Sequence, residues 1–185
     1  MGDHTPSPDA VPPSPRPTAL PVLAKHVPAQ LAAMPQWVGW DWVWHAGRAE
    51  WAKVPRHPRT GGHASATNPG TWTDFDTALA AMTRHDWAGI GFVVTRDDPF
   101  TGVDLDRCRD PRTGALDAWA AEIVAALDSY TEVTPSGTGV RVWVVGTLIG
   151  RLPDGKEGAR RGSIEIYSGS RYFTVTGHRL DGDRS

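Results

Sequence analysis

The sequence contains a single cysteine, Cys108, among its 185 residues. One cysteine excludes an internal disulfide and any zinc site built from several cysteines, and a reducing cytoplasm is the expected location. An excess of charge of either sign is also lacking, because the formal net charge is only -2. The composition of a strongly basic nucleic-acid-binding domain is therefore absent, and any contact with nucleic acid must come from local basic clusters.

Long apolar runs are lacking as well. No stretch of the sequence approaches the roughly 18 to 20 residues that span a bilayer, and the N-terminus lacks the pattern of a secretion signal. We therefore expect no membrane partner. Proline is dense in residues 1–28, which show no apolar periodicity and are expected to form a disordered tail before one folded domain, residues 29–185.

Tryptophan is abundant, with nine residues. Aromatic and β-branched residues predict a hairpin from segments 37–44 and 50–54, in which Trp40, Trp42 and Trp44 share one face. Apolar periodicity predicts helices over 73–84 and 117–128 and a short helical turn near 29–34. Further strands are expected at 89–95, 101–106, 130–134, 140–145, 163–167 and 172–176, with a polar loop before 163 and the last two strands paired as a hairpin. The predicted class is α+β: a mixed or antiparallel central sheet with helices packed on it, plus the N-terminal hairpin.

Two acidic residues, Asp104 and Asp106, alternate with Val103 and Leu105 in a predicted strand. Alternation directs the apolar pair into a core and holds both carboxylates on the opposite face. Neighbouring anions repel one another, and a divalent cation such as Mg²⁺ or Mn²⁺ relieves that repulsion. A solvated strand face with two exposed acids explains the same pattern.

Glu165 stands in a second strand of this kind, between Ile164 and Ile166. If its strand lies near the one that bears Asp104 and Asp106, three carboxylates could converge on one sheet face. Such an arrangement can hold the two cations used in phosphoryl and nucleotidyl transfer. The alternative is a solvated residue at a sheet edge.

A turn rich in glycine and hydroxyl groups separates two of the predicted strands. Glycines allow close approach of the backbone to an anion, and successive N–H groups can surround it. Arginine and lysine nearby would add phosphate contacts. An ordinary hairpin turn with solvated side chains is the competing interpretation. The candidate phosphate-binding residues are Ser136, Gly137, Thr138, Gly139, Arg141 and Lys53.

Three motifs together resemble those of archaeo-eukaryotic-type primases, especially the primase-polymerase domains of phages and mobile elements. They are Gly102-Val103-Asp104-Leu105-Asp106, Ser136-Gly137-Thr138-Gly139-Val140-Arg141 and Ile164-Glu165-Ile166-Tyr167. The resemblance implies an RNA-recognition-like sheet on which Asp104, Asp106 and Glu165 bind the catalytic Mg²⁺ or Mn²⁺ ions. It also implies that the second motif contacts nucleotide phosphates, and that Arg171 and Tyr172 lie near the sugar or base. The family's second motif ends in histidine where this sequence has Arg141, which cannot titrate near neutral pH.

The activity implied by the resemblance is template-directed nucleotidyl transfer, with single-stranded DNA and nucleoside triphosphates as partners. Relatives of this type are often fused to a helicase, so a helicase in cis or in trans is a further expected partner. Two alternatives stay open: a catalytically degenerate domain that binds single-stranded DNA, and a glycosyltransferase whose Asp-x-Asp pair holds a metal against a nucleotide-sugar.

Overall fold

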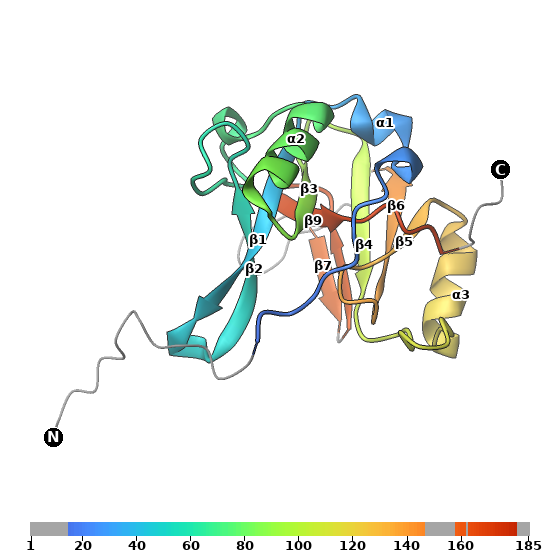
Figure 1. Cartoon of the computed structure of the whole chain (residues 1–185). Coiled ribbons are helices and arrows are strands. Elements are labelled where there is room, and N and C mark those ends of the chain that lie inside the picture. The colour runs from blue at the N-terminus through green and yellow to red at the C-terminus, as the bar shows by residue number, and fades with distance from the viewer. Residues whose placement is uncertain (1–14, 147–157, 162, 181–185) are drawn as a thin grey trace, which may run out of the picture.

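The computed structural model describes residues 15–146, 158–161 and 163–180. The described strands form two antiparallel sheets that lie side by side (Figure 1). The α+β class and the N-terminal hairpin are confirmed. The first sheet has the order β2 (Glu50–Arg56), β1 (Trp37–His45), β3 (Gly89–Val94) and β9 (Arg171–Val175). The second has the order β5 (Thr131–Val133), β6 (Val140–Val145), β4 (Phe100–Leu105), β8 (Ile164–Tyr167) and β7 (Gly158–Arg161).

The helical elements are short. They are α1 (Ala29–Ala32), α2 (Phe75–His85) and α3 (Ala118–Leu127), with 3-10 turns η1 (Ala24–His26), η2 (Ala46–Arg48) and η3 (Pro69–Thr71). Helix α2 begins after Asp74, whose side chain accepts a 2.8 Å hydrogen bond from Thr77 N and so caps the helix. None of the described helices is both long enough and apolar enough to cross a membrane.

The prediction that the last two strands pair with each other was wrong. β8 pairs with β4 and β7 in the second sheet, whereas β9 pairs with β3 in the first. The physical reason is burial: Phe173 and Val175 of β9 join a core with Ile90 and Phe92 of β3, which a hairpin with β8 would not allow. β7 lies in a segment predicted to be a loop, while residues 147–157 and 162 lie outside the described part of the chain.

One core cluster joins the two sheets. Trp143 of the second sheet packs edge-on against Phe92 and Phe173 of the first, with ring centroids 5.7 and 5.5 Å apart. The Tyr167 ring of β8 also packs edge-on against Phe173, with ring centroids 6.0 Å apart. Aromatic contacts of this kind add to the free energy gained from burial, so they fix how the sheets meet.

The second sheet buries its other face against α3. Val103 and Leu105 of β4 and Val140 and Val142 of β6 form this core with residues of the helix. The predicted alternation is therefore confirmed: the apolar side chains of β4 point toward α3, and Asp104 points toward the first sheet.

Residues 15–28 belong to the predicted tail, and the structure describes them as a segment that contains the 3-10 turn η1 and makes specific contacts with the rest of the chain. Leu20 N donates to Pro135 O at 2.9 Å, and Leu23 N donates to Thr176 O at 2.8 Å. Gly177 has φ +71°, and a Cβ at that position would collide with the carbonyl oxygen of Leu23. The segment thus lies directly on the β5–β6 turn and on the end of β9.

Candidate active site

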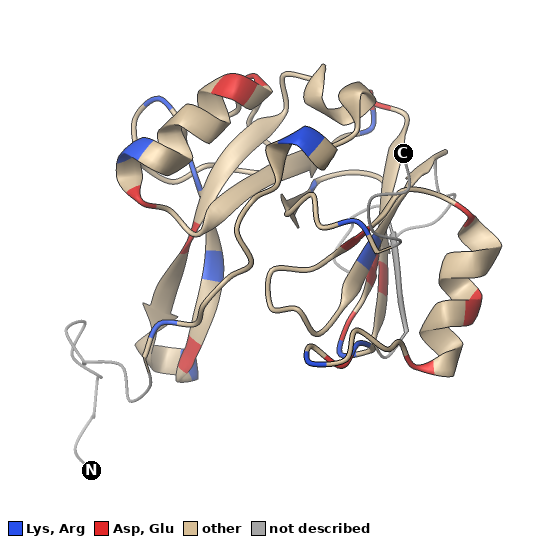
Figure 2. Ribbon diagram, turned by 45° about the vertical axis from the view of Figure 1, so that its right-hand side comes forward, with Lys and Arg blue, Asp and Glu red and all other residues tan. Residues whose placement is uncertain are grey.

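A row of charged residues crosses the second sheet. Asp104 on β4 lies directly opposite Arg141 on β6 and directly opposite Glu165 on β8. Glu132 on β5 lies opposite Arg141. Directly opposite residues of antiparallel strands project from the same face, so these side chains are neighbours. Figure 2 shows acidic and basic positions adjoining one another on these strands.

Arg141 is the centre of this row. Its Nη2 atom lies 2.7 Å from Asp104 Oδ1 and donates to Asp104 Oδ2 at 2.9 Å. Its Nη1 atom donates to the carbonyl oxygen of Thr174 on β9, and its guanidinium lies 4.7 Å from the centre of the Phe173 ring. The residue is only 4% exposed. Arg141 therefore links the two sheets and serves as the counter-ion of Asp104, a role that the sequence did not indicate.

A pocket of about 360 Å³ opens beside this pair. Three of its residues are cationic and one is acidic, and its aromatic side chains come from β1, β2 and β9. The lining residues are Trp42, Trp51, Lys53, Asp104, Arg141, Arg171, Tyr172, Phe173 and Thr174. Five of the predicted site residues are thus brought together, from strands of both sheets.

Lys53 carries one of these positive charges. Its Nζ atom lies 5.6 Å from the centre of the Trp42 ring. Burial lowers its pKa, the positive charges of Arg141 and Arg171 lower it further, and Asp104 opposes them. The backbone carbonyl of Lys53 accepts a hydrogen bond from the Tyr172 hydroxyl, which joins β2 to β9 at the pocket.

Glu165 is buried on the far side of Asp104 from Arg141. Its Oε2 atom accepts hydrogen bonds from the Tyr167 hydroxyl at 3.2 Å and from Arg171 Nη2 at 3.5 Å. The Arg171 guanidinium also lies 4.8 Å from the centre of the Tyr167 ring. The side chain of Arg171 is 39% exposed, so this ion pair is partly screened by solvent.

Asp106 follows the end of β4 and is exposed. Its pKa is raised by partial burial and by the negative charges of Asp104 and Glu165. The three predicted acids therefore lie close enough to repel one another, which is the electrostatic situation that a cation relieves.

The turn before β6 packs against the end of β4. A Cβ on Gly139 would lie 2.6 Å from the carbonyl oxygen of Leu105 and 3.5 Å from the Cα atom of Asp106, so only glycine permits this approach. Ser136 Oγ lies 2.8 Å from Thr138 Oγ1, and Gly137 adopts φ +75°. Of the four predicted turn residues, Gly139 packs against the backbone of Asp106, and Gly137 and Thr138 accept hydrogen bonds from Arg109 through their carbonyl oxygens. None of the four lines the 360 Å³ pocket.

The donor chemistry of the site fits a hard divalent cation. Asp104, Asp106 and Glu165 supply carboxylate oxygens, and Asp104 Oδ1 is buried and accepts no well-aligned hydrogen bond despite its proximity to Arg141. Within the described residues, however, no three His, Cys, Asp or Glu side chains are grouped so that they could hold one ion. In the described structure Asp104 is instead paired with Arg141.

Comparison with known proteins places this geometry in a family. No protein-family model matches the chain. A protein named DNA primase-polymerase, from Nitratiruptor phage NrS-1, is 36% identical to it over 152 residues, which cover 82% of this chain. The chain belongs to the phage-type primase-polymerase family. It spans about a fifth of that relative's length, since the match covers 20% of the phage protein.

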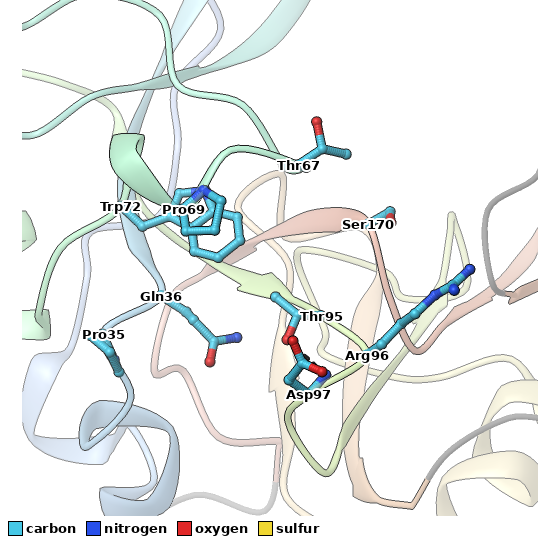
Figure 3. Close-up of a pocket in the computed structure, with 10 residues that line it drawn as sticks. Pro35, Gln36, Thr67, Pro69, Trp72, Thr95, Arg96, Asp97 and Ser170 are labelled. Atoms are coloured by element: carbon cyan, nitrogen blue, oxygen red, sulfur yellow. Dashed lines mark hydrogen bonds between the residues drawn. The ribbon is translucent and has the colours of Figure 1, made fainter.

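A second pocket of this chain contains none of the predicted site residues (Figure 3). Its volume is about 420 Å³, and it lies between the start of β1, the loop before α2 and the β3–β4 turn. Asp98 organises this region, because its carboxylate accepts hydrogen bonds from Gln36 Nε2 at 2.7 Å and from Thr95 N at 2.7 Å. One of its lining residues, Ser170, directly precedes Arg171 in the sequence. The lining residues are Pro35, Gln36, Ala66, Thr67, Pro69, Trp72, Thr95, Arg96, Asp97 and Ser170.

Sequence reasoning missed some of the residues that line the candidate pocket, namely Trp42, Trp51, Phe173 and Thr174. Trp42 and Trp51 line the pocket, and Thr174 accepts hydrogen bonds from Arg141. The alternation of Trp40, Trp42 and Trp44 was a usable signal for a shared face. The signal did not say that this face looks toward Asp104, because that depends on how the sheets pack.

Proposed function

We propose that this chain catalyses template-directed nucleotidyl transfer that depends on Mg²⁺ or Mn²⁺. Its substrates would be nucleoside triphosphates and its template single-stranded DNA, for primer synthesis or extension in the replication of a phage or mobile element. The observation that carries the proposal is the placement of Asp104 in register with Glu165, beside a pocket lined by Lys53 and Arg171. A helicase in cis or in trans would supply the single-stranded template.

The pocket has the chemistry of a nucleotide site. Lys53, Arg141 and Arg171 bring three positive charges toward the bound phosphates, and Trp42 and Tyr172 offer ring surfaces for the base or sugar. Its volume of about 360 Å³ is within the usual range of small-molecule pockets. The turn that contains Ser136 and Thr138 leads into Gly139, which packs against the backbone of Asp106, and this turn would contact the phosphate end.

Asp104, Asp106 and Glu165 would hold the metal ions. When bound, such ions lower the pKa of an attacking 3′-hydroxyl and neutralise the triphosphate. The protein's own contribution is electrostatic: Arg141 and Lys53 place fixed positive charge where the transferred phosphoryl group gains negative charge. Arg141 performs this role without proton transfer, because its guanidinium stays protonated.

Primer extension and de novo synthesis assays test the proposal. The protein is supplied with a single-stranded template, with ribonucleotides or deoxyribonucleotides, and with Mg²⁺, Mn²⁺ or EDTA. We expect template-complementary products that require the metal and that are lost in D106N. Metal-independent products, or full activity of D106N, would overturn the proposal.

The Arg141–Asp104 pair favours one second candidate, a domain that binds single-stranded DNA without catalysis. In that case a permanent cation stands in for the metal at Asp104. The same assays would give no products with any nucleotide, while DNA binding would weaken with salt and be indifferent to metal.

A further inference from the structure

The β1–β2 hairpin extends beyond the sheet to which it belongs. β1 pairs with β3 only from Trp37 to Trp40, whereas its pairing with β2 continues to His45. Residues 41–54 therefore form a two-stranded arm, which projects from the rest of the first sheet in Figure 1. Because the arm has no third strand, none of its side chains is fully buried.

One face of this arm is aromatic. Trp42 lies opposite Lys53, and Trp44 lies opposite Trp51. Alternation places all four on the same face, which we call the aromatic face. The Trp44 and Trp51 rings meet edge-on with centroids 5.8 Å apart, and the four side chains are partly exposed. Asp41, on the opposite face, pairs with Arg16 of the N-terminal segment.

The aromatic face is continuous with the candidate active site. Trp42, Trp51 and Lys53 line the 360 Å³ pocket that contains Asp104. Trp44 is the next aromatic residue outward along β1, and it does not line the pocket. The face thus leads from the acidic residues toward the tip of the arm.

We propose that the aromatic face binds unpaired bases of single-stranded nucleic acid on their way to the pocket. This assignment rests on the proposed function for the identity of the strand as the template. Every base has a π-face that stacks on an indole ring regardless of sequence, and a lysine beside the ring contributes charge toward the backbone. The Lys53–Trp42 contact supplies that combination where the face meets the pocket. A protein partner would need neither the lysine nor continuity with the pocket.

The test is binding of a fluorescein-labelled single-stranded dT12 oligonucleotide, measured by anisotropy without nucleotide or metal. We expect W44L to weaken binding about tenfold, since stacking on one aromatic ring is worth about 1–3 kcal/mol. W44F keeps a ring and should stay within about twofold of the wild type. W119L removes an indole from α3, on the other face of the second sheet, and serves as the matched control with unchanged binding.

Circular dichroism establishes that each variant is folded, and W51L replaces W44L if W44L does not fold. Binding by W44L equal to that of the wild type would overturn the proposal. So would unchanged binding together with lost self-association in W44L, because the aromatic face would then contact a second copy of the chain.

Incorporation assays run in parallel separate the two proposals. Weakened dT12 binding in a chain that incorporates no nucleotide supports the aromatic face and rejects the polymerase activity. Full incorporation with dT12 binding unaltered in W44L supports the polymerase activity and rejects the aromatic face as a binding site.

Discussion

Arg141 on β6 and Asp104 on β4 form an ion pair between directly opposite positions of adjacent strands, with Nη2 2.7 Å from Oδ1. The side chains of both residues are largely buried, at 5% and 14% exposed. Arg141 also donates to the backbone of β9, so it connects the two sheets. Because it pairs with Asp104 in a buried position, it would compete with any cation that binds that carboxylate.

Replacing Arg141 with methionine separates these two roles. Loss of one member of a buried pair should lower the free energy of unfolding by about 3 kcal/mol, which urea denaturation measures. In R141M the released Asp104 should bind Mn²⁺ more tightly, so Mn²⁺ should raise the melting temperature more than it does in the wild type. Equal Mn²⁺ shifts in both proteins would mean that Arg141 does not compete with metal.

Asp104 and Asp106 should differ when each is changed to asparagine. D106N should lose at least about 100-fold in nucleotide incorporation with an unchanged melting temperature, because Asp106 is exposed. D104N should lose activity and also stability, because it removes the charge that pairs with buried Arg141. Thermal melts of the two variants, side by side, test the difference, and equal melting temperatures would contradict it.

Lys53 should limit activity at high pH. Burial and the nearby arginines lower its pKa, so its charge is lost at a lower pH than that of an ordinary lysine. If this charge binds the triphosphate, the KM for nucleotide should rise as pH increases through the lowered pKa. K53R keeps its charge at every accessible pH and should flatten that rise. The measurement is KM against pH for both proteins, and parallel profiles would assign the rise to another group.

Glu132 should make stability depend on pH. It is fully buried, and its Oε2 accepts hydrogen bonds from Gly177 N at 2.7 Å and Thr176 N at 3.0 Å. Burial raises its pKa, with Arg141 and these hydrogen bonds opposing the rise. Because the folded state then holds the proton more tightly than the unfolded state, the contribution to stability is complete below the unfolded pKa. It is lost as pH rises through the folded pKa.

The E132Q variant tests this linkage. As pH rises through the folded pKa of Glu132, urea denaturation should show the free energy of unfolding of the wild type falling relative to that of E132Q. E132Q should also be less stable at low pH, because its amide nitrogen cannot accept one of the hydrogen bonds that the carboxyl accepts. A constant difference between the two proteins at every pH would argue against a raised pKa.

Local patterns were sufficient to predict much of this fold. Alternation assigned Val103 and Leu105 to a core and Asp104 to the opposite face, and capping by Asp74 marked the start of α2. These features depend on a few consecutive residues. The strands were located for the same reason to within two residues at each end. The exception is β7, whose segment of glycine, alanine and arginine has no apolar alternation.

Register and sheet membership could not be predicted, because they depend on contacts between distant segments. The residues next to Phe173 in the sequence do not indicate that its strand pairs with β3 rather than with β8. The pairing of Arg141 with Asp104, 37 positions apart, has the same origin. The charge of Arg141 indicated a phosphate contact, and only the fold reveals the carboxylate beside it.

The docked segment from residue 15 to residue 28 has a practical consequence for expression. A truncated gene that starts at Ala29, where the folded domain was predicted to begin, would remove the donors of the Leu20–Pro135 and Leu23–Thr176 hydrogen bonds. It would also remove Leu23 from its contact with Gly177, whose backbone N–H donates to Glu132 Oε2. Recombinant versions of this protein are therefore best begun upstream of Arg16, with any purification tag placed ahead of that point.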